Sequence, residues 1–137
     1  MSCALLHGRM CHSYEYIPDV VPDFIYLDGP STADVEGSVN GMTFARNPDR
    51  TVMSADPCIM ESILLPGCFM VIDGRTNNAR FIKNNFQRQW CYDWLEDRDV
   101  STFELVEEPL GELNRNMLVY CGLRQSTNIT SSPAKER

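Results

Sequence analysis

The chain has 137 residues, of which 43% are hydrophobic, and its formal net charge is −7 at pH 7. This length fits about one domain, and the composition is that of a globular protein. The acidic balance argues against a reader of DNA or RNA, which needs clustered Lys and Arg to neutralise phosphates. No apolar stretch approaches the roughly 20 residues of a membrane-spanning helix, and the N-terminus lacks the apolar core of a secretory signal. We therefore expect a cytoplasmic protein with no nucleic-acid and no membrane partner.

The six cysteines are scattered along the chain, with no CxxC pair and no spacing typical of a zinc site. We expect reduced thiols that pack as small apolar side chains rather than a disulfide framework. The two histidines, His7 and His12, have no partner at ligand spacing, and we expect them to be exposed.

The N-terminal part of the chain predicts at best one short strand, near residues 12–17. The next segment, FIYL at 24–27, is continuously apolar and ends on Asp28 and Gly29. Such a run is typical of a strand in a parallel sheet that is covered on both faces, so we expect it to be a central strand. Residues 29–54 are rich in Gly, Pro, Asn and Asp, and they form a longer connection than is usual, which indicates a functional loop.

A helix is expected from Asp56, which can cap it, with Pro57 in the first turn and apolar residues at helical spacing after it. Pro66 and Gly67 end this helix. The segment FMVI at 69–72 is a second apolar strand, and it ends on Asp73 and Gly74. The three elements predict a parallel strand-helix-strand unit with both Asp-Gly pairs at the same edge of the sheet.

The chain after the second strand predicts a helix over 77–90 with one apolar stripe: Ala79, Ile82, Phe86 and Trp90. Residues 101–108 and 114–122 are strand-like, and the connection EPLGEL predicts that they form an antiparallel hairpin. The tail, 123–137, is polar and is expected to be disordered. We therefore expect one α/β domain over 1–122.

This order of elements resembles the second half of a class I S-adenosylmethionine-dependent methyltransferase. The segments PDFIYLDGP, LLPG, VIDGRTNNARFIKNNFQRQW and FELVEEPLG also look like a bacterial group of methyltransferase-like proteins of undefined substrate. The likeness spans about residues 11–122. It implies a partial Rossmann-like sheet, S-adenosylmethionine as cofactor, and O-methyl transfer to a small, sugar-like acceptor.

The cofactor-binding residues of that family have no counterpart in the sequence before Asp28. The family carries a Gly-rich loop after its first strand and an acidic residue at the end of its second, and neither stands in this sequence. We therefore expect a partial domain, assign no cofactor-binding residues, and do not expect autonomous methyl transfer by this chain.

Asp28 and Asp73 are the candidate catalytic residues, because open α/β sheets bind ligands beyond the carboxyl ends of their strands. Together with Asn77 or Asn78 they would supply oxygen ligands for Mg²⁺ or Ca²⁺. Related methyltransferases hold a metal with an aspartate after each strand and an asparagine directly after the second, where this chain has Gly74. Alternatively, Asp28 is a general base for an acceptor hydroxyl, or either aspartate only shapes an Asp-Gly turn.

Arg75, Asn77, Asn78 and Arg80 are candidate substrate-binding residues at the start of the expected second helix. The free amides and the dipole of a helix N-terminus attract anions, so a substrate carboxylate or phosphate could dock there. The alternative is that Thr76 or Asn77 caps the helix and both arginines are solvated.

Two functions stay open at this point. One is a methyltransferase-like enzyme that acts on a small-molecule acceptor. The other is a non-catalytic half-domain that pairs through an exposed sheet edge beside residues 24–27, with itself or with a missing N-terminal half. A third option, a receiver-type domain, would need an acidic pair after its first strand, and none is visible. The sequence does not identify the acceptor, the metal or the oligomeric state.

Overall fold

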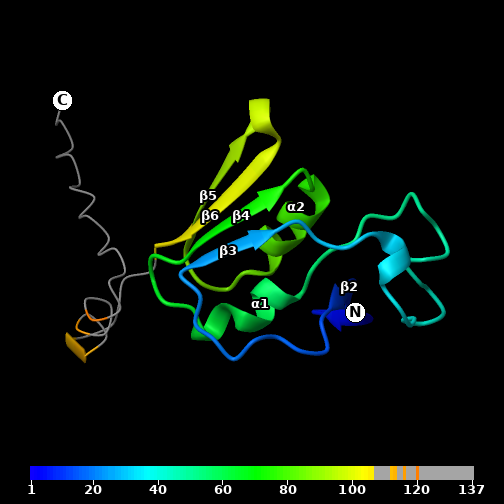
Figure 1. Ribbon diagram of the computed structural model, residues 1–137, viewed down its shortest axis with the longest axis horizontal. Helices are drawn as coiled ribbons and strands as arrows, with labels where there is room; N and C mark the ends of the chain where they lie inside the picture. Colours follow the sequence, from blue (N-terminus) through cyan, green and yellow to red (C-terminus); the bar gives the residue numbers. More distant parts are fainter. Residues whose placement is uncertain (107–111, 114–115, 117–119, 121–137) are drawn as a thin grey trace, which may run out of the picture.

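The computed structural model describes residues 1–106, 112–113, 116 and 120, and within them the chain is a mixed α/β structure with two sheets (Figure 1). The small sheet is the antiparallel hairpin of β1 (Ser2–Leu6) and β2 (Arg9–Ser13). The larger sheet has the order β3-β4-β6-β5, with β3 (Phe24–Leu27), β4 (Phe69–Asp73), β5 (Trp90–Leu95) and β6 (Val100–Leu105). The α-helices are α1 (Asp56–Met60), followed directly by the 3₁₀ turn η2 (Glu61–Ile63), and α2 (Thr76–Asn85). None of the helices in this part of the chain is long and apolar enough to cross a membrane.

The strands β3 and β4 pair in parallel, with Phe24 opposite Phe69 and Leu27 opposite Ile72. This confirms the predicted parallel pair and its common carboxyl edge. The last strand, β6, lies between β4 and β5 and is antiparallel to both. The closing antiparallel hairpin of the sheet is therefore β5 and β6. β6 confirms the first strand of the predicted hairpin, 101–108, but its hairpin partner is β5, which precedes it, and not 114–122. Most of the second predicted strand, and the whole of the 123–137 tail, lie outside the described residues.

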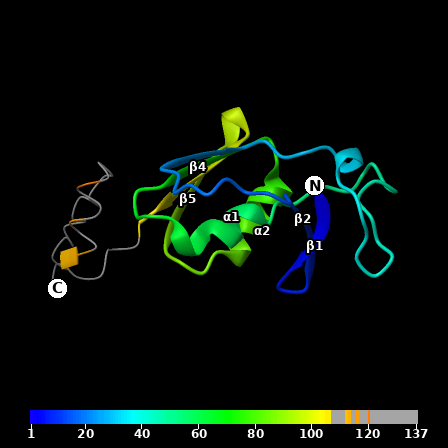
Figure 2. The same cartoon turned by 60° about the horizontal axis from the view of Figure 1, so that its bottom comes forward.

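One face of the larger sheet carries the core. Alternate residues of β4 and β6 are buried there together with one side of α2: Met70, Ile72, Phe103, Leu105, Ala79 and Ile82. Figure 2 shows both helices on this side, and no described element lies over the opposite face. The prediction that FIYL is a central strand covered on both faces is therefore wrong. β3 is an edge strand of the described sheet, and Phe24 and Tyr26 on its open face are 55% and 57% exposed.

The helix α2 ends at Asn85, five residues earlier than predicted, because buried Glu61 accepts the backbone N–H groups that follow. Its carboxylate accepts from the N–H of Gln87 at 2.9 Å and from the N–H of Arg88 at 2.9 Å, which draws the chain out of the helix. Phe86 and Trp90 still pack together, with ring centroids 4.3 Å apart, but Trp90 does so as the first residue of β5.

The N-terminal hairpin was not predicted, since a single strand near 12–17 was expected. Its turn, His7-Gly8, has positive φ at both residues, 49° and 75°. This is the backbone of a tight hairpin turn, and His-Gly is a weaker signal for it than Asn-Gly.

The 29–54 loop lies beside that hairpin (Figure 1), and main-chain hydrogen bonds join the two. Near its start, the N–H of Cys3 donates to the carbonyl of Glu36 at 2.8 Å, and after its end the N–H of Ala55 donates to the carbonyl of His12 at 2.9 Å. The loop also has a small core of its own, formed by Val35, Phe44 and Val52. The hairpin therefore acts as the support that gives this long connection a defined shape.

Candidate functional site

A cleft of about 770 Å³ opens at the carboxyl ends of β3 and β4. Its walls are Asp28 after β3, residues 73–78 from the end of β4 to the first turn of α2, residues 31–32, and residues 48 and 50–52 of the loop. The site is mixed in charge, with two aspartates and two arginines, Arg50 and Arg75. Both strand-end aspartates thus line one cleft, as predicted from the parallel pair.

Asp28 is the more available of the two carboxylates. Its side chain is 70% exposed, and its Oδ1 lies 3.7 Å from Nε of Arg75, beyond ordinary hydrogen-bond distance. Arg75 is held instead by the carbonyl of Pro30, to which its Nη1 donates at 3.0 Å. The following Gly29 has φ +80°, so the glycine rather than the aspartate makes the turn possible. Asp28 is therefore free to accept a hydrogen bond from a ligand.

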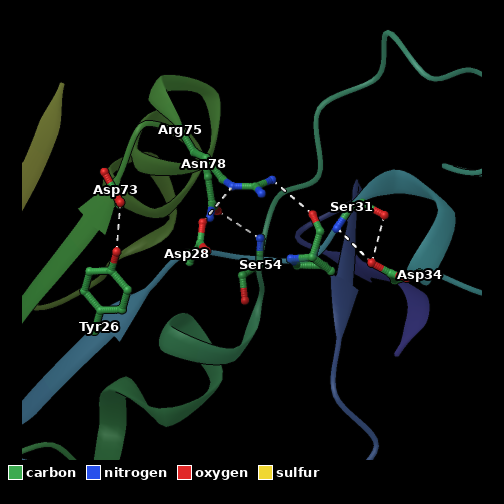
Figure 3. A network of polar contacts seen from close by, with 9 residues as sticks. Tyr26, Asp28, Ser31, Asp34, Ser54, Asp73, Arg75 and Asn78 are labelled. Carbon is green, nitrogen blue, oxygen red and sulfur yellow. Dashed lines mark hydrogen bonds and ion pairs between the residues drawn. The ribbon is translucent and has the colours of Figure 1, made fainter.

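Asp73, in contrast, is engaged by a neighbouring strand. The hydroxyl of Tyr26 donates to its Oδ2 at 2.8 Å, across the parallel pair. This hydrogen bond, with smaller effects of desolvation and of the charges of Asp73 and Asp28, raises the pKa of the Tyr26 phenol above its ordinary value of 10.0. Figure 3 shows the two carboxylates turned toward different partners, Asp73 toward Tyr26 and Asp28 toward Arg75.

The predicted metal site of Asp28, Asp73 and Asn77 does not fit this arrangement. The two carboxylates pair with Arg75 and Tyr26, and the side-chain amide of Asn77 donates to Oγ1 of Thr51 at 3.0 Å. In the described part of the chain, no three His, Cys, Asp or Glu side chains come together as metal ligands. The donor set therefore gives no support to Mg²⁺ in this cleft.

The segment GRTNNAR, predicted to bind substrate, divides between the cleft and the surface. Arg75, Asn77 and Asn78 line the cleft, whereas Arg80 is exposed on α2 and is not part of its lining. Asn78 is almost fully buried, and its Oδ1 accepts the backbone N–H of Ser54 at 2.9 Å. No side chain caps the first turn of α2, so the predicted capping by Thr76 or Asn77 is wrong.

A buried polar layer lies beneath the cleft and was missed by the sequence reasoning. His12 is fully buried on β2, which contradicts its predicted exposure, and neither ring nitrogen has a hydrogen-bond partner among the described residues. Burial lowers the pKa of His12 below 6.5; the charge of Asp56 opposes this, while the N-terminal amine and Arg75 add to it. Asp56, predicted as a helix cap, instead accepts hydrogen bonds from Ser13, Tyr14 and Ser54. It thereby joins the hairpin to α1.

The described cysteines are free thiols, as predicted, and the buried ones are not nucleophiles. Burial raises the pKa of Cys11 and Cys68 to about 11 and that of Cys58 to about 12. Such thiols stay protonated at neutral pH, and the thiolate is the reactive form. Chemistry at the cleft therefore depends on its oxygen and nitrogen groups.

Comparison of the chain with protein-family models, with curated proteins and with solved structures finds no match. The function is therefore argued from the cleft itself.

Proposed function

We propose that the protein binds a small, hydroxyl-bearing molecule in the cleft at the carboxyl ends of β3 and β4, as the acceptor side of a methyltransferase-like fold. The observation that carries this proposal is the convergence of two strand ends, Asp28 and Asp73, on one cleft of about 770 Å³. A volume of this size is typical of small-molecule sites. The parallel pair β3 and β4, followed by a closing antiparallel hairpin, agrees with the order of elements on which the resemblance rests.

Within this proposal Asp28 receives the acceptor hydroxyl. Its carboxylate is exposed and only loosely paired, so it can accept a hydrogen bond from a hydroxyl and would act as the general base toward it. Asp73 has the supporting role, because it lines the cleft but its carboxylate already accepts a hydrogen bond from Tyr26.

S-adenosylmethionine would supply the electrophilic methyl group in such a reaction. The described residues do not fit a binding site for its adenosine, which would need a Gly-rich loop after a strand. β3 is followed by Asp28-Gly29-Pro30, and β4 by a turn with the single glycine Gly74. The proposal therefore concerns the acceptor side of the reaction.

Amide-resolved NMR titration with neutral hydroxyl compounds tests acceptor binding. We expect glucose, inositol or catechol at millimolar concentration to shift the amide signals of Gly29, Gly74 and Thr76, which lie in or beside the cleft. Asp28→Asn should weaken binding by about fivefold to tenfold, because a charged acceptor is replaced by a neutral one. Asp19→Asn is the matched control, because Asp19 is exposed and does not line the cleft. Shifts spread over the surface, or equal effects of the two variants, would count against the proposal.

The free edge of β3 favours a second candidate function, an interaction module. The carbonyl of Asp23 accepts the N–H of Phe69 at 2.9 Å, so in the alternating pattern of a parallel pair the N–H and C=O groups of Phe24 and Tyr26 point away from β4. No strand of the described chain pairs with that edge. Such an edge is a template for pairing with another strand, from a second copy or from a separate half-domain.

Light scattering coupled to size-exclusion chromatography tests the self-association form of this second candidate. We expect a concentration-dependent dimer that Phe24→Pro abolishes, since proline removes the outward N–H while the first position of an edge strand tolerates it. Phe24→Leu keeps the N–H and should keep the dimer. A monomer at every concentration would contradict self-pairing.

A further inference from the structure

The first turn of α2 forms one end of the cleft. Thr76, Asn77 and Asn78 all line it, and this turn has no side-chain cap and no acidic residue. The first amides of a helix have no partner inside the helix, and the helix dipole favours negative charge beside them. By itself this is a property of most helices.

Asn78 adds an observation specific to this site. Its Oδ1 accepts the N–H of Ser54 at 2.9 Å, which sets the orientation of the amide, because the reversed amide would place two donors against each other. Its Nδ2 is therefore a donor. Although Asn78 is only 1% exposed, this nitrogen has no acceptor among the described residues. Figure 3 shows the side chain directed from α2 toward Asp28 and Ser54, and the residue lines the cleft. A buried donor without an acceptor is uncommon, and a ligand oxygen would satisfy it.

Arg75 supplies positive charge next to the same turn. Its guanidinium holds the carbonyl of Pro30 through Nη1 and lies 3.7 Å from Asp28 through Nε, so further N–H donors remain for a ligand. Arg50 also lines the cleft, anchored by a hydrogen bond from its Nη1 to the carbonyl of Thr43. Fork-shaped guanidinium groups suit carboxylate and phosphate oxygens.

The donors and the available acceptor thus lie side by side in one cleft, with Nε of Arg75 3.7 Å from Oδ1 of Asp28. Helix amides, the Asn78 amide and Arg75 gather at the start of α2, while Asp28 is the carboxylate that remains free for a hydroxyl. We infer that the cleft takes a hydroxylated anion, with its carboxylate or phosphate group at the start of α2 and a hydroxyl group at Asp28. This inference rests on the proposed acceptor site and names the chemical class of its ligand.

Titration calorimetry at constant ionic strength, with glucose, glucuronate and glucose 6-phosphate as probes, tests the inference. We expect one or both anions to bind the wild-type chain at least about tenfold more tightly than glucose, as charge-assisted hydrogen bonds require. The two anions distinguish a carboxylate site from a phosphate site. Inorganic phosphate should compete with the preferred anion and not with glucose.

Two matched arginine variants locate the anion. Arg75→Gln should weaken anion binding by about tenfold more than it weakens glucose binding. Arg80→Gln makes the same change of charge on an exposed residue outside the cleft, and it should change neither. Asn78→Asp keeps an acceptor for Ser54 but replaces the free donor with a negative charge, so it should abolish the preference for anions.

The outcomes separate this inference from the proposed function. If glucose binds in an Asp28-dependent manner but neither anion binds more tightly, the inference is overturned and the acceptor site stands. If Arg75→Gln and Arg80→Gln weaken anion binding equally, the attraction is a general surface effect and the inference is again overturned. If no probe binds, both proposals fail.

Discussion

Two buried polar centres of this molecule differ in how completely their hydrogen bonds are made. Glu61, 5% exposed, accepts hydrogen bonds from the backbone N–H groups of Gln87 and Arg88 and from the indole of Trp90, at 2.9–3.0 Å. By contrast, both ring nitrogens of His12 and the Nδ2 of Asn78 are buried and have no hydrogen-bond partner within the part of the chain that the structure describes. A buried polar group whose hydrogen bonds are all made stabilises the fold, whereas a buried polar group without partners lowers the free energy of unfolding.

The position of each centre explains the difference. Glu61 joins three elements, because η2, the end of α2 and the start of β5 all meet at its carboxylate. His12 and Asn78 instead lie where the hairpin, the end of the 29–54 loop and the start of α2 meet, next to the cleft. We therefore expect substitutions at the first centre to affect stability, and those at the second to affect pH response and binding.

The largest expected effect is that of Glu61→Ala. The substitution removes part-buried hydrogen bonds from Gln87, Arg88 and Trp90 to a charged group, at about 1.5–3 kcal/mol each, so the free energy of unfolding should fall by about 4 kcal/mol or the chain should fail to fold. Urea unfolding followed by circular dichroism measures this. Glu15→Ala, at an exposed position, is the control and should change stability by less than about 0.5 kcal/mol. A loss below about 1 kcal/mol for Glu61→Ala would mean that the centre is not structural.

A smaller effect is expected from the pH dependence of the second centre. Because burial lowers the pKa of His12 below 6.5, the unfolded chain binds a proton below pH 6.5 that the native chain does not. The contribution of His12 to the free energy of unfolding is therefore complete above pH 6.5. It falls as the pH is lowered through this value, by up to about 1.4 kcal/mol per pH unit. Urea unfolding should therefore give a lower free energy of unfolding at pH 5.5 than at pH 7.5, with at most about 1.4 kcal/mol of the difference due to this residue.

His12→Leu provides the reference for that measurement. Leucine replaces a buried imidazole that has no hydrogen bond to any described residue, so it should stabilise the chain slightly at pH 7.5 and remove this part of the pH dependence. If the variant is destabilised and its pH dependence is unchanged, His12 is paired in solution, and the contrast with Glu61 disappears.

The smallest effect on stability is expected for Tyr26→Phe, because the hydrogen bond it removes is exposed. The informative measurement is the ultraviolet titration of the phenols. In the wild-type chain one tyrosine should ionise later than an ordinary phenol, since the pKa of Tyr26 is raised by its bond to Asp73. This late component should be absent from the variant, and its persistence would show that the bond to Asp73 does not form.

Several elements followed from local patterns in the sequence. The continuous apolar runs FIYL and FMVI are strands, and they pair in parallel with Asp28 and Asp73 at one edge. Placing both aspartates at one cleft required only that parallel strands end at the same edge. Pro57 is likewise in the first turn of a helix.

Other features depended on contacts between distant residues and had no local signal. The end of α2 is set by Glu61, more than twenty residues away in the chain, and periodicity alone extended that helix to Trp90. The burial of His12 accompanies its place on the hairpin, where main-chain hydrogen bonds join it to Met53 and Ala55, more than forty residues away in the chain. An apolar run also does not show which of its faces is covered, so β3 was placed at the centre of the sheet rather than at its edge.

The amino-acid order alone thus determined where the main strands lie and which acidic residues end them, because side-chain alternation and turn residues act within a few positions. Tertiary structure decided that Asp28 is available while Asp73 is engaged, and that Asn78 keeps a buried donor without an acceptor. Each property depends on a partner that is distant in the sequence: Arg75 for Asp28, Tyr26 for Asp73 and Ser54 for Asn78. These pairs come into contact only after the chain has folded.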